Sequence, residues 1–297
     1  MPELPEVEAA RRTAERVAAG RRIVSVWCAD DPIVLETPPA RLRRALLGRR
    51  VLRVGRHGKH FWLEQDRRPW LLVHFGMSGG LYTPGRGVRL RSSGSRDWRV
   101  DWPPRFAKLR LTLDDRGELA IADARRLGRI RLGDDPRCEP PLSALGFDAL
   151  RELPPPARFR ALLTARAAPV KAVLLDQSFA AGVGNWVADE VLYQARIAPR
   201  RLARSLSPAE AGRLRGALRR VLVTAVRAGA DSDRYPRGWL FHRRWDHGTA
   251  TRRGEPIRHE TIAGRTAAWV PARQRCSALS PGVEPKMHPS TTTGWTT

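Results

Sequence analysis

The first residues of the chain could form the site of a covalent reaction. Pro2 follows Met1, and a small second residue permits removal of the initiator Met, so we expect the mature chain to begin with the secondary amine of Pro2. Attack of this amine on an aldehyde carbon gives an iminium that is always cationic and therefore acts as an electron sink. An α-amino group has an ordinary pKa of about 7.7–8.0, so part of it is unprotonated at neutral pH. Glu3 and Glu6 lie nearby and suit general acid or base work, although Pro and Glu are also common at helix starts.

A lysine at a predicted turn is the second candidate. Of the 54 basic residues only four are lysines, namely Lys59, Lys108, Lys171 and Lys286. Lys59 lies at the tip of a glycine-containing turn between two predicted strands, within residues 55–61. Its ammonium group is a compact point charge suited to a phosphate or to a reacting oxygen. A solvated turn residue is the alternative interpretation.

A glycine-rich loop between two predicted helices is the third candidate. The helical runs cover residues 170–176 and 187–194, and the loop between them contains Gly182-Val183-Gly184-Asn185. Glycine lets a backbone approach a ligand closely, and we expect Asn185 to be the N-cap of the second helix. The N-terminus of a helix attracts phosphate. The alternative is a helix–turn–helix unit that serves core packing only.

The elements before residue 133 predict a sandwich or barrel with an N-terminal helix. Apolar residues recur at helical spacing over residues 5–19, and Gly20 follows as a stop. Short β-like runs follow, the last two joined by a hairpin turn: 23–27, 51–54, 61–64, 70–75, 108–113 and 118–122. Residues 84–105 are rich in Gly, Arg and Ser and are expected to form an exposed, solvated loop.

The second half of the chain is predicted to be mainly helical. A proline-rich connector covers residues 133–156, and a helical pattern runs over residues 157–228. Residues 239–243 and 266–270 are then expected to pair as a β-hairpin. The loops and turns that hold the three candidates are thus placed by a β unit and a helical unit together.

The composition bounds the partner and the compartment. Lys and Arg number 54 against 30 Asp and Glu, so the formal net charge is +24. Such an excess indicates a polyanion such as DNA or RNA as the partner, although an arginine bias can also reflect a GC-rich genome. The chain has no apolar run near the ~20 residues of a membrane span, and its acidic start is unlike a signal peptide. Its three cysteines are far apart and form no disulfide framework, so we expect a soluble protein of a reducing compartment.

Together these segments resemble the formamidopyrimidine-DNA glycosylase and endonuclease VIII family of base-excision repair enzymes. The stretch Met1-Pro2-Glu3-Leu4-Pro5-Glu6-Val7-Glu8 is similar to the N-terminal signature of that family. Its sandwich-domain motifs look like Gly58-Lys59 and His74-Phe75-Gly76-Met77-Ser78-Gly79. Its helix–two-turns–helix looks like residues 175–185. The resemblance covers the chain from residue 1 to about residue 275.

The resemblance implies a multidomain α+β fold. A β-sandwich with an N-terminal helix would precede a helical helix–two-turns–helix domain, which carries a zincless β-hairpin finger at its C-terminal end. We expect five segments: an N-terminal catalytic β-sandwich domain (1–132), a linker (133–156), a helix–two-turns–helix DNA-binding domain (157–235), the finger (236–276) and a disordered tail (277–297).

The resemblance also implies catalytic roles. Pro2 would attack C1′ of the damaged nucleotide, displace the base and form a Schiff base, while Glu3 protonates the opening sugar and Glu6 supports the site. Elimination would then cut the strand on both sides of the sugar. Lys59 would grip a phosphate that flanks the lesion, and the finger's Arg265 would bind the phosphate beside it. Asn185, together with Gly184 of the same loop, would contact the DNA backbone, and the grip would help extrude the nucleotide because unstacking costs a few kcal/mol.

Three further residues are implied to act where the base is extruded from the duplex. Met77 matches the residue that fills this void, and Arg125 would face the orphaned partner base. Wedges of this kind occur in DNA-bending proteins. Here Ala124 replaces a proline of the family pattern, and Leu127 sits where an aromatic wedge is usual. Leucine stacks less well than phenylalanine, so we expect weaker discrimination of the opposite base.

The finger departs from a zinc-binding pattern. A zinc finger needs four Cys or His ligands in two close pairs, whereas the candidates here are scattered: His242, His247, His259 and Cys276. Residues 261–271 nevertheless keep the hairpin of the zincless fingers found in some branches of the family. We therefore expect no metal and no other cofactor, and we expect apolar packing to replace the metal, by Trp239, Phe241, Trp245 and Trp269.

The expected substrate is damaged double-stranded DNA, bound by a monomer in the cytoplasm, on the nucleoid if the source is bacterial. The segment from Gly229 to Gly238 is short, whereas purine-specific members have a longer loop that covers 8-oxoguanine. We therefore expect better excision of ring-opened purines and further-oxidised guanine. Two alternatives stay open: an endonuclease VIII-type enzyme for oxidised pyrimidines, and a non-catalytic DNA-binding homologue, which would not need Pro2, Glu3 and Lys59.

Overall fold

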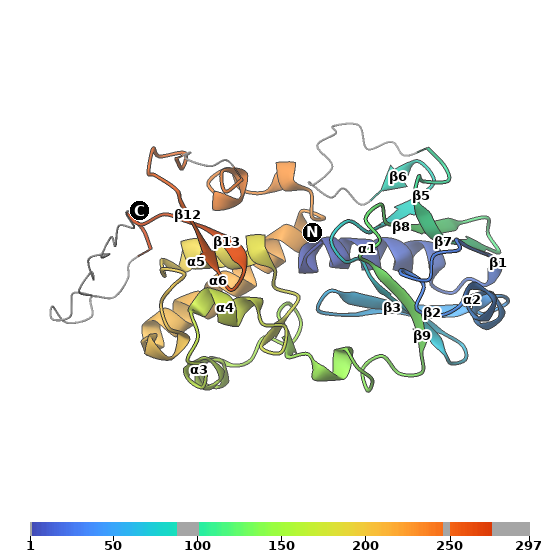
Figure 1. The fold of residues 1–297 in the computed structure, drawn as a ribbon, viewed down its shortest axis with the longest axis horizontal. Helices are drawn as coiled ribbons and strands as arrows, with labels where there is room; N and C mark the ends of the chain where they lie inside the picture. Colours follow the sequence, from blue (N-terminus) through green and yellow to red (C-terminus); the bar gives the residue numbers. More distant parts are fainter. Residues whose placement is uncertain (1, 88–100, 246–249, 275–297) are drawn as a thin grey trace, which may run out of the picture.

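The first half of the chain folds into two β-sheets, which confirms the predicted sandwich. The structure is a computed structural model and describes residues 2–87, 101–245 and 250–274 (Figure 1). One sheet has five strands in the order β1 (Ile23–Cys28), β7 (Ala107–Leu113), β8 (Glu118–Ala122), β5 (Gly80–Thr83) and β6 (Arg86–Gly87). The other has four antiparallel strands in the order β2 (Val51–His57), β3 (His60–Gln65), β4 (Trp70–His74) and β9 (Arg129–Gly133).

The N-terminal helix α1 (Leu4–Ala18) joins both sheets to the helical half. The sequence predicted this helix one residue later, over residues 5–19. Of its apolar stripe, Val7, Ala10 and Ala14 are fully buried and Val17 is partly buried, and the helix contacts strands of both sheets. Its first residue, Leu4, belongs instead to the core of the helical half. Helix α1 also contacts α6, and a second short helix, α2 (Pro39–Leu46), packs on β1. The residues before α1 therefore lie where the two cores meet.

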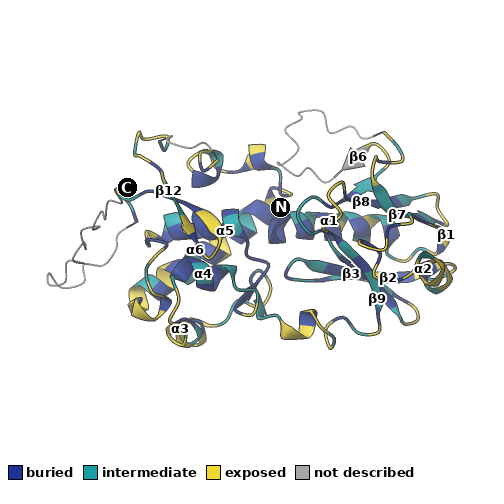
Figure 2. Ribbon diagram, viewed as in Figure 1, coloured by how far each residue is buried: buried dark blue, intermediate teal, exposed yellow. Residues whose placement is uncertain are grey.

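In the residues that the structure describes, the helical half contains four α-helices. They are α3 (Pro156–Thr164), α4 (Val170–Leu175), α5 (Asn185–Ala195) and α6 (Pro208–Arg227). Helix α5 is buried on nearly every side, and Figure 2 shows it dark along most of its length, because α4, α6 and the finger hairpin surround it. Short 3₁₀ turns lie between these helices and the strands: η2 (Leu142–Ala144), η3 (Ala203–Ser205), η4 (Ser232–Arg234) and η5 (Leu240–His242). Within the described residues no helix is long and apolar enough to cross a membrane.

The connector between the two halves is structured. Its strand β10 (Phe147–Asp148) pairs in parallel with β11 (Ala180–Ala181), which leads into the glycine-rich loop. The proline-rich connector therefore contacts the candidate loop directly.

The C-terminal hairpin differs from the expected one. Strand β12 (Arg258–Ile262) pairs with β13 (Arg265–Trp269), so the expectation that residues 239–243 form one of the strands is wrong. Those residues form η5 instead, because Phe241 packs against Trp186 and Tyr235 and its backbone N–H donates to buried Glu190 at 2.9 Å. Part of the exposed loop expected over 84–105, the tail 277–297, and the candidates His247 and Cys276 lie outside the described residues.

Candidate active site

Glu3 joins the N-terminus of the chain to the start of helix α5. Its carboxyl oxygens accept hydrogen bonds from the backbone N–H groups of Trp186 (2.9 Å) and Val187 (3.1 Å), and its side chain is buried. A carboxylate at this position satisfies the free N–H groups of a helix and interacts well with its dipole. The expectation that Asn185 is the N-cap is therefore wrong: Gly184 is the N-cap residue, Asn185 is the first helical residue, and Glu3 supplies the acceptor.

The two glycines of the loop make room for the N-terminal segment. A Cβ on Gly184 would lie 2.2 Å from Cδ of Glu3. Gly182 has a φ of +98°, and a Cβ there would lie 2.5 Å from Cδ1 of Leu4. The backbone N–H of Leu4 donates to the Gly182 carbonyl at 3.1 Å. Docking of the N-terminal segment therefore requires glycine at both positions, whether or not the loop also binds a ligand.

Four of the predicted catalytic residues form one electrostatic cluster. Burial lowers the pKa of Lys59, whose charge also interacts with those of Glu3, Arg265 and Glu6. Burial raises the pKa of Glu3, against the charge of Lys59 and the two amide hydrogen bonds. Burial and the neighbouring Glu3 raise the pKa of Glu6 to about 7, and its Oε2 accepts a hydrogen bond from the Glu3 backbone N–H at 2.9 Å. Pro2 is buried beside this cluster. Acids and a base with such shifted pKa values are typical of active sites.

The finger hairpin reaches this cluster from the other side. Arg265 is exposed and begins β13, directly after the turn formed by Ala263 and Gly264, both with positive φ. The next residue, Thr266, accepts a hydrogen bond through its carbonyl from Nδ2 of Asn185 at 2.9 Å. The other side-chain atom of Asn185, Oδ1, is buried and has no hydrogen-bond partner among the described residues. The structure therefore brings the glycine loop and the finger together.

A buried ion network holds the finger on the helical half. Asp189 of α5 accepts from Nζ of Lys171 (2.6 Å) and from Nη2 of Arg244 (2.7 Å), and it also accepts from the β13 backbone N–H of Ala268 (3.1 Å). Lys171 donates in addition to the carbonyl of Thr266 at 2.8 Å. All three charged side chains are at least nine-tenths buried. Charged groups with their hydrogen bonds satisfied in this way fix one geometry of the segments that they join.

Aromatic packing is one of several kinds of contact that hold this finger. Trp239 and Phe241 do pack around Trp186, and the ring of Trp245 meets that of Phe241 edge-on with centroids 6.0 Å apart, but Trp245 is 49% exposed, with the Arg244 guanidinium over its ring. The hairpin is also held by the ion network and by a small apolar cluster, made of Leu240, Ile257, Ala268 and Val270. Among the residues that the structure describes, no three His, Cys, Asp or Glu side chains lie close enough together to hold a metal ion.

The three residues predicted to act where the base is extruded lie together on two turns of the sandwich half. Nη2 of Arg125 donates to the carbonyl of Met77 at 3.1 Å. Asp123 orders the second turn, because its carboxylate accepts from the backbone N–H groups of Arg125 (3.2 Å) and Gly128 (2.6 Å). Leu127 is 43% exposed at the tip. An exposed leucine at an ordered turn is available for contact with a partner.

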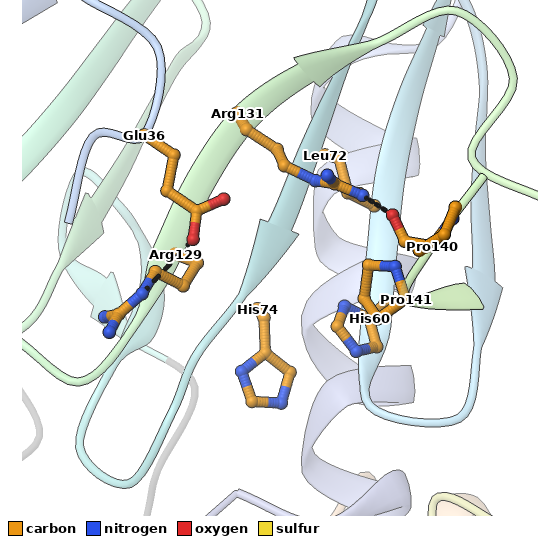
Figure 3. A pocket seen from close by; sticks show the side chains of 8 residues that line it. All are labelled: Glu36, His60, Leu72, His74, Arg129, Arg131, Pro140 and Pro141. Carbon is orange, nitrogen blue, oxygen red and sulfur yellow. Dashed lines mark hydrogen bonds and ion pairs between the residues drawn. The ribbon is translucent and has the colours of Figure 1, made fainter. Parts of the chain in front are cut away.

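A groove lies on the four-stranded sheet and is lined by His60, the residue after Lys59 (Figure 3). Its volume is about 360 Å³, and none of the predicted catalytic residues lines it. Two histidines that pair across β3 and β4, His60 and His74, face each other with ring centroids 4.5 Å apart. Burial lowers their pKa values to about 3 and about 4, so both are neutral at pH 7. Arg129, paired with Glu36 at 3.3 Å, gives the rim of the groove a cationic group.

Sequence reasoning missed Asp189, Arg244 and the capping role of Glu3. A signal for Asp189 was present, since a helix that is apolar on all sides must pair any carboxylate that it carries. The partner could not be deduced, because Arg244 is one of many arginines and lies 55 residues away. The same distance problem, over 183 residues, hid the hydrogen bond between Glu3 and Trp186.

Known proteins resemble the chain over nearly its whole length. The model of the formamidopyrimidine-DNA glycosylase N-terminal domain matches residues 1–130, and that of the H2TH domain of the same enzyme matches residues 145–236. The formamidopyrimidine-DNA glycosylase of Arabidopsis thaliana is 40% identical over 278 residues, which are 93% of this chain and 71% of that protein. The Thermus thermophilus enzyme is 37% identical, over 92% of this chain and 98% of its own.

Solved structures agree with this similarity. The crystal structure of the MutM (Fpg) protein from Thermus thermophilus superimposes with a TM-score of 0.73 at 35% identity and covers 92% of this chain and 98% of that one. The complex of a Lactococcus lactis Fpg mutant with a Fapy-dG containing DNA gives a TM-score of 0.76 at 25% identity and covers 93% and 100% of the two chains. The fold, the positions of the N-terminal signature and the glycine loop, and the matches to both domain models lead to one conclusion: the chain belongs to the formamidopyrimidine-DNA glycosylase family.

Proposed function

We propose that the protein is a bifunctional DNA glycosylase and AP lyase that removes damaged bases from double-stranded DNA in base-excision repair. The observation that carries this proposal is the insertion of the Pro2-Glu3 segment between helix α5 and the Lys59 turn. A protein that only bound DNA would have no need to bury a carboxyl group of raised pKa beside a potential amine nucleophile. Membership in the family supports the same activity.

The reaction would begin at Pro2. While Met1 is attached, the Pro2 nitrogen is part of a peptide bond and is not nucleophilic, so removal of Met1 creates the reactive amine. The amine attacks C1′ of the damaged nucleotide, the bond from C1′ to the base breaks, and the base leaves with a proton. Glu3, whose pKa is raised by burial, donates a proton to the ring oxygen as the sugar opens. The product is an iminium between Pro2 and C1′.

The iminium would then drive strand cleavage. It withdraws electrons, so a proton is lost from C2′ and the 3′ phosphate leaves in β-elimination. A second elimination expels the 5′ phosphate. Lys59 and Arg265 place positive charge beside these phosphates, and Asn185 adds a hydrogen-bonding group at the helix N-terminus. Fixed charge aimed at a leaving phosphate stabilises the developing negative charge.

DNA binding and base extrusion would use the turns of the sandwich half. Met77 would fill the space of the extruded base, Arg125 would face the partner base, and exposed Leu127 would press against the stack. Phosphate contacts would supply most of the affinity and make it dependent on salt, as expected for a chain of net charge +24. Such an enzyme would act on chromosomal DNA, in the cytoplasm of a bacterial source.

The substrate would be a ring-opened or further-oxidised purine. The segment 229–238 is short, and its residues 232–234 form a 3₁₀ turn, which leaves little chain to cover a flipped 8-oxoguanine. The hydroxyl of buried Tyr235 has no hydrogen-bond partner in the described part of the chain, and it interacts with the charges of Glu6 and Glu3. A side-by-side excision assay on 8-oxoguanine, ring-opened guanine and an oxidised pyrimidine would test this preference, and faster excision of 8-oxoguanine would contradict it.

Borohydride trapping on a damaged duplex tests the activity. We expect the processed wild-type chain to form a covalent adduct with DNA, and we expect no adduct from Pro2→Gly or from a chain that retains Met1. Binding of the same duplex without any trapped adduct would support the non-catalytic alternative.

A further inference from the structure

One buried arginine connects the N-terminal helix with the Lys59 turn and, through Asp148, with the strand that precedes the glycine loop. Arg56 lies on β2, three residues before Lys59, and its side chain is fully buried. Its Nε donates to Oε2 of Glu8 at 2.8 Å. Its Nη1 and Nη2 donate to the two carboxylate oxygens of Asp148, at 2.6 and 3.0 Å. Nη1 also donates to the carbonyl of Gly58 at 2.8 Å. The guanidinium therefore uses every one of its nitrogens to bind the chain.

Asp148 completes the grip on the turn before Lys59. Its Oδ2 accepts a hydrogen bond from the backbone N–H of Gly58 at 2.8 Å. Both polar backbone groups of Gly58 are thus held, one by Arg56 and one by Asp148. Gly58 has a φ of +56°, and a Cβ on it would lie 3.0 Å from Cβ of Ala181. The buried charges of Arg56 and Asp148 therefore fix the backbone conformation of the turn that carries Lys59.

The two carboxylates that bind Arg56 belong to the helix that follows Pro2 and Glu3 and to the strand beside the glycine loop. Glu8 lies on α1, a little over one helical turn after Glu3, and it accepts further hydrogen bonds from Arg11 and Arg12 at 3.1 and 3.0 Å. Asp148 lies on β10, which pairs with the strand directly before the glycine loop. A rigid path of buried contacts thus runs from α1 through Arg56 to the Lys59 turn and to the loop of Asn185.

We propose that Arg56 and Asp148 are positioning residues, which hold Lys59 at working distance from Pro2 and Glu3. The effect of these residues on the reaction rate rests on the proposed function. A bidentate arginine–carboxylate pair fixes distance and angle together. A lysine keeps the charge, but a single ammonium group cannot bind Glu8, both oxygens of Asp148 and the Gly58 carbonyl at once. Since a displacement of about 1 Å in an active site can cost about 100-fold in rate, loss of this geometry affects chemistry more than DNA affinity.

The test compares two conservative variants with two matched controls. Arg56→Lys is paired with Arg53→Lys on the same strand, where Arg53 is 60% exposed and pairs with Glu64. Asp148→Asn is paired with Asp135→Asn in the same connector, where Asp135 binds arginines at the surface. Each protein is assayed at a temperature at which circular dichroism shows it folded. Single-turnover rates of borohydride trapping and the Kd for a duplex with a tetrahydrofuran abasic analogue are measured.

We expect Arg56→Lys and Asp148→Asn to lower the trapping rate by about 10- to 100-fold, with a Kd within about threefold of wild type, and both controls to match wild type. Folded Arg56→Lys that traps at the wild-type rate would overturn the proposal. A parallel loss of rate and affinity would also overturn it, since that result indicates a general structural role.

A second measurement does not depend on catalysis. Only four lysines occur in the chain, so acetylation by a mild reagent can be followed at each by peptide mass spectrometry. In Asp148→Asn we expect Lys59 to be acetylated several-fold faster than in wild type, with Lys108, which pairs with Asp31 at 2.7 Å, unchanged. Equal acetylation of Lys59 in both proteins would refute the positioning role, whether or not the wild-type chain forms an adduct with DNA. A missing adduct in the wild-type chain would instead count against the proposed function.

Discussion

Substitution of Gly184 by alanine tests how the N-terminal segment docks. The φ of Gly184 is −125°, which any residue adopts, so alanine adds no backbone strain. Its Cβ would however lie 2.2 Å from Cδ and 2.5 Å from Oε1 of Glu3. An ordinary contact needs at least about 3.4 Å, so the Glu3 carboxyl group must retreat by more than about 1 Å. That retreat breaks both of its hydrogen bonds to helix α5.

The expected cost follows from those two bonds. A buried N–H that loses its acceptor costs about 1–3 kcal/mol, so two give at most about 6 kcal/mol. Partial relaxation reduces this value, and we expect Gly184→Ala to lower the free energy of unfolding by about 2–4 kcal/mol. Because the Glu3 carboxyl group leaves its position in the cluster with Lys59, we expect the trapping rate to fall by at least about 100-fold.

Gly212 provides the matched control. It lies inside α6, and a Cβ there meets nothing within 4 Å. Gly212→Ala should therefore raise the free energy of unfolding by about 0.5–1 kcal/mol and leave trapping unchanged. Urea unfolding and single-turnover trapping measure both effects. If Gly184→Ala is as stable as wild type and traps at the same rate, Glu3 does not dock as described and the reasoning is refuted.

Three further predictions concern other parts of the molecule. Asp189→Ala leaves Lys171 and Arg244 buried without their carboxylate, so we expect urea unfolding to show a loss of about 3–5 kcal/mol; a loss under 1 kcal/mol would mean that the ion network does not hold the finger. Burial raises the pKa of Glu190 to about 7, above its ordinary 4.5, so the folded state keeps a proton that the unfolded chain releases, and stability falls as pH rises from about 4.5 to 7. Between pH 4.5 and 7.5, the free energy of unfolding of Glu190→Gln should fall by about 1–3 kcal/mol less than that of wild type. An equal fall in both proteins would contradict the raised pKa of Glu190. Leu127→Phe should sharpen discrimination of the opposite base in excision assays over the four partner bases, and an unchanged preference would show that Leu127 does not contact the stack.

The sequence predicts those features that depend on neighbours along the chain. The apolar periodicity of α1 and the hairpin turn between β7 and β8 were predicted correctly because helix and hairpin preferences are local. The Lys59 turn was predicted for the same reason. The reactivity of the Pro2 amine followed from its chemistry alone, whereas the family resemblance added its target in DNA and the role of Arg265, which no local pattern indicates.

Features that depend on distant partners could not be predicted. Asn185 satisfies every local rule for an N-cap, yet Glu3 supplies the acceptor from the other end of the fold. Residues 239–243 have the composition of a strand, but contacts with buried Trp186 and Glu190 favour a 3₁₀ turn. In each case hydrogen bonds and packing with residues distant in the sequence outweigh a local preference of a few tenths of a kcal/mol.

The central claim is that the amine of Pro2 forms the covalent bond to DNA. The most direct measurement is peptide mass spectrometry of the borohydride-reduced adduct between the processed chain and an abasic-site duplex. We predict that the sugar fragment lies on the N-terminal peptide, at the nitrogen of Pro2. An adduct on Lys59 or on any other residue, or no adduct while the duplex is bound, would contradict the account.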